Sequence, residues 1–401
     1  MSVFTFHFVS LSHPPWLHGN LQAAIARLGG QGVGIFFVIS GFLLYRPFAD
    51  AAFRCAPSPS LRPFWLRRFV RIFPAYWIAL TAYVYFFGFF SIHGFANFVT
   101  YYGLLQNYRG GYALFGLGIA WTLVIEVSFY LALPLINQIA RAAAGNRAAA
   151  DRVYRVQMGL IVSLCAIGLA VRALNIWVVN TSRRGAWFPL HASGYSLLAY
   201  LDWFAIGMAF AVLTVSPPTR RRLPRVASAL GRHALACWLV ALGVFAVQAR
   251  LLQTISLGPN RLVNFALPFL IGVTALFIVL PAVFGDQDQS VIRRFLQSKS
   301  IVYLGGISYG IYLWHFIIVA QSGLWVANGT LPDVFIVRFV AVFTITVAVA
   351  SASYYVLERP LIAWSHRVSG PRPTPDQRAA YTGTSPLHAS STQDRHSQAQ
   401  D

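Results

Sequence analysis

The sequence predicts an all-α membrane protein, a helix bundle with about ten transmembrane helices, and three observations point to this fold class. First, only 10% of the 401 residues are charged, whereas a soluble domain carries about 25%. Second, 57% of the residues are hydrophobic and the mean hydropathy is +0.59. Third, long apolar segments alternate along the chain with short loops that hold arginines. The chain is therefore expected to cross a membrane many times.

The apolar segments have the length of membrane spans. An α-helix rises about 1.5 Å per residue, so about 20 residues cross the roughly 30 Å of hydrocarbon in a bilayer. Nine of the ten segments approach or exceed this length. We expect residues 1–364 to form one integral membrane domain. The segments cover residues 1–12, 30–48, 72–92, 112–136, 156–179, 195–215, 233–250, 262–284, 301–325 and 333–357.

The first segment, residues 1–12, is the exception in length. As a helix it spans only about 18 Å. It has neither the basic n-region nor the small-residue cleavage site of a signal peptide. We therefore expect either a re-entrant segment or a helix whose beginning lies before Met1.

The basic residues predict the orientation in the membrane. If the N-terminus is cytoplasmic, the loops on that side hold 18 basic residues and the opposite loops hold six. Cytoplasmic loops of membrane proteins carry an excess of Lys and Arg, so both termini are predicted in the cytoplasm. The net charge of +20 is scattered over several loops and forms no single stripe, which argues against nucleic-acid binding.

Two further features of composition bear on organisation. Residues 365–401 are rich in Ser, Pro, Gln, Thr and Ala and are predicted to form a disordered cytoplasmic tail. The three cysteines, Cys55, Cys165 and Cys237, are far apart and lack metal-ligand spacing, so we expect neither a metal site nor structural disulfides.

Glu126 is a carboxylate in the middle of the apolar stretch WTLVIEVSFYLALPLI, residues 121–136. An ionisable side chain at the bilayer centre costs about 2.5–3.5 kcal/mol on insertion scales, so it is expected to face the protein interior or a wet cavity. Trp121 and Thr122 precede it by about one helical turn and Tyr130 follows by about one turn. These three side chains can orient the carboxylate, or they can form a structural hydrogen-bonded knot.

His7 lies in the apolar stretch SVFTFHFV and is our first choice as the partner of Glu126. A neutral imidazole can accept a proton at physiological pH and hydrogen-bond a carboxylate through its other nitrogen. The alternative is a histidine that only hydrogen-bonds a backbone carbonyl. Later in the chain, ISYGIYLWHF places His315 three residues after Tyr312, and both are expected to support the site.

Arg68 and Arg71 lie in LRPFWLRRFVRIFPAYW, at the start of a predicted span. A spacing of three puts both on one face of a helix at the cytoplasmic interface. Guanidinium groups bind phosphates with two parallel hydrogen bonds. The alternative is a topological anchor that contacts anionic lipid.

Small residues cluster in GGQGVGIFFVISGFLLY, where Gly32, Gly34 and Gly41 accompany Ser40. In membrane helices such residues ordinarily allow close approach between neighbours, and packing is the role predicted for this stretch. Ser40 is also expected to support the site.

Two features near the ends of spans complete the candidates. Asp202, in LAYLDWFAIG, is a secondary candidate for a binding residue. The stretch YYVLERP places Glu358 beside Arg359 and Pro360. Pro360 is expected to end the last helix, and Glu358 is expected to form a local ion pair.

Taken together, these stretches resemble the acyltransferase 3 family of integral membrane O-acyltransferases. The likeness runs in the family's order from Ser2 to about Pro360, nearly the whole predicted membrane domain. Besides His7 in the first helix, the matching motifs are GVGIFFVISGFLL, RRFVRIFPAYW, WTLVIEVSFYL, SYGIYLWH and LERP.

The resemblance implies transfer of an acyl group, often acetyl, from a cytoplasmic acyl-CoA to a hydroxyl of a sugar, glycolipid or glycoside, in a bacterial cytoplasmic membrane. It implies that His7 is the catalytic histidine, that Glu126 is the acidic residue of a WTLxxE-type motif, and that Arg68 and Arg71 are the RxxR pair facing acyl-CoA. No bound cofactor is implied. The family has an arginine upstream of the histidine at a position that falls before Met1 here, so we expect a start upstream of Met1.

The residues favour one mechanism and leave alternatives open. We expect His7, polarised by Glu126, to remove the proton from an acceptor hydroxyl as it attacks the thioester carbonyl. Alternatively, the acyl group passes through His7 as a covalent carrier. A rival from another class is a proton-coupled transporter or flippase, although no paired halves are visible in the sequence. A scaffold without any site is the third interpretation.

Overall fold

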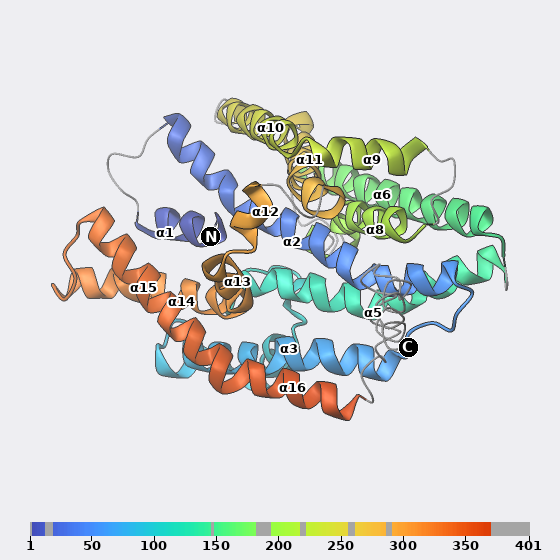
Figure 1. Ribbon diagram of the computed structural model, residues 1–401. Helices are drawn as coiled ribbons and strands as arrows, with labels where there is room; N and C mark the ends of the chain where they lie inside the picture. The colour runs from blue at the N-terminus through green and yellow to red at the C-terminus, as the bar shows by residue number, and fades with distance from the viewer. Residues whose placement is uncertain are drawn as a thin grey trace, which may run out of the picture.

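The computed structural model describes residues 2–12, 19–145, 148–181, 194–216, 222–255, 261–285 and 291–369, and within these ranges the regular structure is helical (Figure 1). The longer helices are α1 (Ser2–Ser12), α2 (Gly19–Phe53), α3 (Leu61–Thr81), α4 (Gly94–Tyr102), α5 (Trp121–Ala144), α6 (Ala150–Thr181), α8 (Leu201–Val215), α9 (Arg222–Arg232), α10 (Ala234–Ile255), α11 (Arg261–Phe284), α12 (Val291–Leu296), α13 (Lys299–Gly306), α14 (Ser308–Ala327), α15 (Phe335–Ser353) and α16 (Arg359–Val368). Short 3-10 turns cover Gln106–Tyr108, Gly118–Ala120 and Leu197–Tyr200, and π-helical turns cover Ala82–Phe86 and Tyr354–Glu358.

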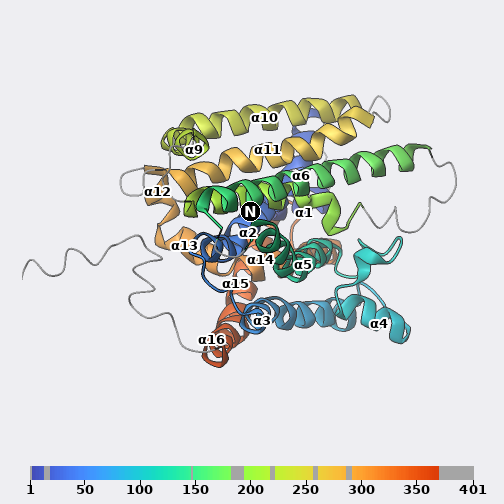
Figure 2. The ribbon, with the colours of Figure 1, turned by 90° about the vertical axis from the view of Figure 1, so that its right-hand side faces the viewer.

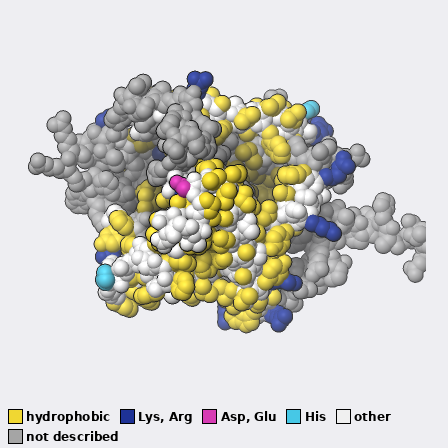
Figure 3. Space-filling model, turned by 90° about the vertical axis from the view of Figure 1, so that its left-hand side faces the viewer, with side chains coloured by type: hydrophobic (Ala, Val, Ile, Leu, Met, Phe, Trp, Pro, Cys, Tyr) yellow, Lys and Arg dark blue, Asp and Glu magenta, His cyan; other side chains and the backbone are white. Residues whose placement is uncertain are grey.

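The helices confirm the predicted membrane bundle. Among the described residues, nine helical segments are long and apolar enough to cross a membrane, and the tenth predicted segment is the short apolar helix α1. Figure 3 shows one face of the molecule, whose described surface is largely hydrophobic. Figures 1 and 2 place α10 and α11 side by side at one side, α3 and α16 at the opposite side, and α2 and α5 between them.

Two predicted boundaries are wrong. The span expected at 72–92 begins at Leu61 and ends, with its π-helical turn, at Phe86. Its arginine-bearing first turns are helical because arginine is a good helix former, whereas an apolar run marks only the later turns. The span expected at 301–325 is divided at Ile307 into α13 and α14.

Glycines bring α2 and α8 into close contact. A Cβ atom added to Gly207 of α8 would overlap the carbonyl oxygen of Val38 in α2, and one added to Gly41 of α2 would overlap that of Phe204 in α8. Only glycine permits this backbone approach. The packing role predicted for the small residues of α2 is thereby confirmed at Gly41.

Stacked aromatic rings hold α5 in the centre of the bundle. Phe204 of α8 stacks on Phe37 of α2 at a centroid distance of 4.7 Å and on Phe129 of α5 at 4.0 Å. All three side chains are fully buried. Aromatic pairs of this kind add about 0.5–1.5 kcal/mol beyond the area that they bury. This stack fixes the helix that carries Glu126 against α2.

The last helix continues past Pro360, contrary to the prediction. After α15 the chain makes the π-helical turn Tyr354–Glu358 and proceeds directly into α16. Pro360 is the second residue of α16 and directly follows the π-helical turn, where the regular α-helical hydrogen bonds are already interrupted. Glu358 is buried and accepts a hydrogen bond from the Ser353 hydroxyl at 3.1 Å. Of the predicted tail, residues 370–401 lie outside the described part.

Candidate active site

A cavity of about 400 Å³ lies among α1, α2, α3, α5 and α14. Small-molecule sites in proteins have volumes of about 300–1,000 Å³. Most residues predicted for the site line this cavity, and they come from four helices that are distant in sequence, α2, α3, α5 and α14. The predicted residues among its lining are Ser40, Arg68, Arg71, Thr122, Glu126, Tyr130, Tyr312 and His315.

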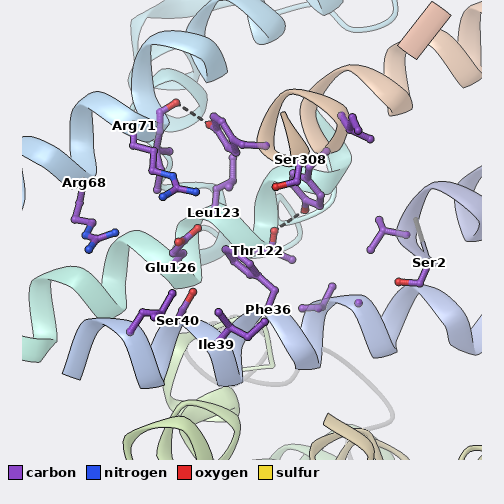
Figure 4. Close-up of a pocket in the computed structure, with 18 of the residues that line it drawn as sticks. Ser2, Phe36, Ile39, Ser40, Arg68, Arg71, Thr122, Leu123, Glu126 and Ser308 are labelled. Atoms are coloured by element: carbon purple, nitrogen blue, oxygen red, sulfur yellow. Dashed lines mark hydrogen bonds between the residues drawn. The ribbon is translucent and has the colours of Figure 1, made fainter. Parts of the chain in front are cut away.

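Arg68 and Arg71 form one end of the cavity. Figure 4 shows both side chains reaching from α3 toward Glu126 of α5, with Ser40 of α2 beside the carboxylate. The guanidinium carbon of Arg68 lies 6.0 Å from the centroid of the Tyr130 ring. Within the part of the chain that is described, neither arginine has a carboxylate oxygen within 4 Å. Two cations therefore face the cavity without a closed ion pair.

The carboxylate of Glu126 is held by Tyr130, one turn further along α5. The Tyr130 hydroxyl donates a hydrogen bond to Glu126, and only 6% of Glu126 is exposed. The Trp65 indole N–H donates to the backbone oxygen of Tyr130 at 3.0 Å, which ties α3 to α5. Trp121, also expected here, instead packs against the rings of Tyr195 and Tyr200 and is not among the cavity-lining residues.

The histidines lie at the other end of the site. His315 lines the cavity, and its Nε2 atom lies 3.0 Å from Nδ1 of His7. His7 is itself not among the lining residues, although Ser2, Val3 and Phe4 of its helix are. The direct hydrogen bond that we expected between His7 and Glu126 is not formed. His7 instead contacts His315 of α14, and the Glu126 carboxylate accepts a hydrogen bond from Tyr130.

Helix α14 connects the two ends through its tyrosines. The Tyr312 hydroxyl lies 2.5 Å from both the Thr122 hydroxyl and the backbone oxygen of Ile119. The Tyr309 hydroxyl donates to the backbone oxygen of Ile72 in α3 at 2.7 Å. Tyr309 also lines the cavity, and sequence reasoning missed it. Its spacing of three residues before Tyr312 is the signal that puts it on the same face.

Asp202, the secondary candidate, is instead part of a buried ion pair. Arg172 donates from Nη1 and Nη2 to its two carboxylate oxygens at 2.9 and 2.8 Å. The side chains of Arg172 and Asp202 are 8% and 6% exposed, and neither lines the cavity. Both carboxylate oxygens of Asp202 accept hydrogen bonds from Arg172, so this ion pair links α6 to α8.

Across the described ranges, no three His, Cys, Asp or Glu side chains gather in a way that could hold a metal ion.

The fold and the cavity define an integral membrane helix bundle with a buried site that combines paired arginines, a carboxylate and a histidine pair. Residues 1–355 match the family model Acyl_transf_3, described as an acyltransferase domain. The chain therefore belongs to the acyltransferase 3 family. The resemblance noted in the sequence is thereby confirmed.

Three relatives illustrate the family. The O-acetyltransferase OatA of Staphylococcus aureus is 24% identical over 85% of this chain and 54% of its own length. The peptidoglycan O-acetyltransferase OatA of Listeria monocytogenes is 23% identical over 85% of this chain and 53% of its own. Nodulation protein 10 of Rhizobium leguminosarum is 25% identical, over 82% and 81%. The chain spans about half the length of the two OatA proteins. No solved structure matches it.

Proposed function

We propose that this chain is a membrane-embedded O-acyltransferase that moves an acyl group, in the simplest case acetyl, from cytoplasmic acyl-CoA to a hydroxyl of a sugar, glycolipid or glycoside. One observation carries the proposal. One cavity is lined both by Arg68 and Arg71, which have no carboxylate partner within 4 Å among the described residues, and by His315, whose Nε2 atom contacts His7; Glu126 lies at the arginine end. Membership of the acyltransferase 3 family agrees with this activity.

The arginine end suits the phosphates of coenzyme A. A guanidinium group binds phosphate through two parallel, charge-assisted hydrogen bonds, each stronger than a bond between neutral groups. Arg68 and Arg71 lie ten and thirteen residues after the exposed Ser58 of the loop between α2 and α3, a loop that the positive-inside rule assigns to the cytoplasm. Acyl-CoA made in the cytoplasm would therefore meet the arginines first, with its thioester directed into the cavity.

The histidine end suits proton transfer. In the proposed step, His7 removes the proton from the acceptor hydroxyl while the hydroxyl oxygen attacks the thioester carbonyl. The carbon–sulfur bond then breaks, coenzyme A leaves as its thiolate, and the proton on His7 passes to that sulfur. A positioned base contributes about 10²- to 10⁴-fold to the rate. The covalent alternative, with the acyl group carried on His7, predicts an acyl-histidine that can be trapped.

Glu126 has a different role in this proposal from the one expected from the sequence. Because Tyr130 holds its carboxylate on the side of Arg68 and Arg71, Glu126 would orient the two guanidinium groups and limit their mutual repulsion. His315 instead would be the polarising partner of His7.

The acceptor is proposed from chemistry and from the relatives. Two of them are named for O-acetylation, one of peptidoglycan, and a hydroxyl-bearing glycan of the bacterial envelope would fit a transferase in the cytoplasmic membrane. Both termini are proposed to be cytoplasmic, with the acceptor reaching the histidine end from the opposite side.

A transfer assay tests the proposal. Membranes that contain the protein should release coenzyme A from labelled acetyl-CoA and pass the label to an acceptor, and His7→Ala should lower this rate by about 10²- to 10⁴-fold. His366→Ala is a matched control, because His366 is exposed on α16. Proton-coupled flux of a substrate without acyl transfer would instead favour a transporter.

The acceptor can be sought in cells. Acylated glycans and glycolipids should be compared between cells with the gene, cells without it and cells carrying His7→Ala. A hydroxyl ester that is present only with the wild-type gene would identify the acceptor. Identical ester profiles in all three would contradict the proposed function.

A further inference from the structure

His7 and His315 form a pair between α1 and α14 that contains no carboxylate. The two residues are 308 positions apart, and Nε2 of His315 lies 3.0 Å from Nδ1 of His7. His315 is 1% exposed. The ring of Phe4 lies 6.2 Å from that of His315, and the ring of Phe316 lies 5.4 Å from that of His7. Among the described residues, neither histidine is part of an ion pair.

The surroundings of His315 determine which of its nitrogens carries the proton. Its Nδ1 atom lies 3.0 Å from the backbone oxygen of Ile311 and 2.7 Å from that of Tyr312. Carbonyl oxygens only accept hydrogen bonds, so Nδ1 must be the donor. In a neutral imidazole the other nitrogen then holds a lone pair. Nε2 of His315 therefore faces His7 as an acceptor.

The same reasoning determines the tautomer of His7. Its Nδ1 atom lies 3.0 Å from the acceptor Nε2 of His315 and 3.0 Å from the backbone oxygen of Val3. Two acceptors at one nitrogen require a proton on it, so Nδ1 of His7 donates. The lone pair of His7 is then on Nε2, and no described side chain or backbone group hydrogen-bonds that atom. Nε2 is the basic nitrogen of the pair.

We propose that His315 is a positioning residue that fixes His7 as its Nδ1–H tautomer and stabilises the charge that His7 gains when Nε2 accepts a proton. The inference rests on the proposed function, in which His7 is the base. A proton moves from the acceptor hydroxyl to Nε2, and the Nδ1 proton remains shared with His315. That hydrogen bond then becomes charge-assisted, and such bonds are roughly twice as strong as neutral ones.

A neutral imidazole suits this role within a membrane. In serine hydrolases, a buried carboxylate holds the catalytic histidine in the correct tautomer and stabilises its imidazolium form. A second carboxylate in an apolar interior would carry the cost of burying another charge. His315 instead supplies a lone pair without a charge, and the carbonyls of its own helix hold its ring in place.

Two substitutions at His315 test whether the hydrogen-bond acceptor at its Nε2 position, and not merely the size of the side chain, is required. An asparagine amide reaches about as far as Nδ1, so His315→Asn retains a donor toward the helix carbonyls but has no acceptor at the Nε2 position. A glutamine amide reaches that position, so His315→Gln can present an oxygen to His7. We expect Asn to lower kcat about 10- to 100-fold with an unchanged KM for acetyl-CoA, and Gln to restore most of kcat. Equal losses in the two variants, or full kcat in His315→Asn, would overturn the proposal.

A measurement on the resting protein tests the tautomer without any reaction. In ¹⁵N-histidine-labelled protein reconstituted in lipid bilayers, solid-state NMR distinguishes protonated from unprotonated ring nitrogens. The signals of His7 are those that disappear in His7→Gln. We expect a protonated Nδ1 and an unprotonated Nε2, and the opposite pattern would overturn the inference. Lack of acyl transfer by the wild-type protein would overturn the proposed function instead, so the two failures can be told apart.

Discussion

The protein contains arginines beside a carboxylate in two places, and their hydrogen bonds differ. Between α6 and α8, Arg172 and Asp202 form a bidentate pair in which both carboxylate oxygens are bonded. In the cavity, Arg68 and Arg71 lie near Glu126, but Glu126 is bonded by Tyr130, and neither arginine closes an ion pair with another described residue.

We propose that this difference separates charges with a structural role from charges that bind a ligand. A buried ion pair with complete hydrogen bonds is satisfied within the protein and adds little affinity for anything else. Arg68 is only partly buried and Arg71 is exposed, so these two cations with one nearby carboxylate leave a positive charge that a phosphate could reach. We therefore propose that an anion completes the cavity, whereas the pair between α6 and α8 is already complete. Substitutions in the Arg172–Asp202 pair should therefore change stability, whereas substitutions of the cavity arginines should change the KM for acetyl-CoA.

The largest expected effect is a loss of stability when the Arg172–Asp202 ion pair is broken. Asp202→Ala leaves the Arg172 cation buried with the backbone oxygen of Ala199 but without a carboxylate, and removing one member of a buried ion pair costs about 3–5 kcal/mol. Thermal unfolding of the protein in nanodiscs should show the loss as a lower midpoint. The folded fraction should keep its KM for acetyl-CoA. A raised KM with unchanged stability would mean that Asp202 contacts the ligand.

A smaller effect, on the affinity for acetyl-CoA, is expected when one of the two cavity arginines is replaced. Arg71→Met removes one guanidinium group from the proposed phosphate site, and a hydrogen bond to a charged group contributes about 1.5–3 kcal/mol. KM for acetyl-CoA should rise about 10- to 100-fold, with little change in stability. Arg67→Met is the matched control, because Arg67 is on the same helix but does not line the cavity. Equal KM values in both variants would contradict a phosphate site at Arg71.

The smallest effect is expected when Arg172 and Asp202 are replaced together. Arg172→Met combined with Asp202→Leu removes the two charges together, and apolar replacement of a buried ion pair is often neutral or stabilising by about 1–4 kcal/mol. Both the unfolding midpoint and the acyl-transfer rate should stay near the wild-type values. A loss of transfer in a folded double variant would show that this pair is coupled to the site.

The sequence predicts the membrane bundle well because hydropathy depends on local composition. It also predicts that Arg68, Arg71 and Glu126 belong to one site, since motifs of a known family mark them, and the cavity brings them together. Boundaries are predicted less well. The first turns of α3 and the turns after Pro360 are helical although their composition is that of helix ends.

The partners of the site residues could not be predicted, because they depend on which helices are neighbours. His7 contacts a histidine 308 positions away, and nothing in SVFTFHFV indicates α14. For the same reason the sequence alone does not reveal the partner of Asp202, Arg172, which lies 30 positions earlier in a separate helix. Only Tyr130 was predictable as a partner of Glu126, since the two are four residues apart on one helix.

The most direct test is a cryo-electron microscopy map of the protein in nanodiscs with coenzyme A bound. We predict that phosphate oxygens lie within hydrogen-bond distance of Arg68 and Arg71, and that the pantetheine arm runs through the cavity so that the thiol points toward His315 and His7. Coenzyme A bound away from this cavity, or with its thiol at the arginine end, would contradict the account.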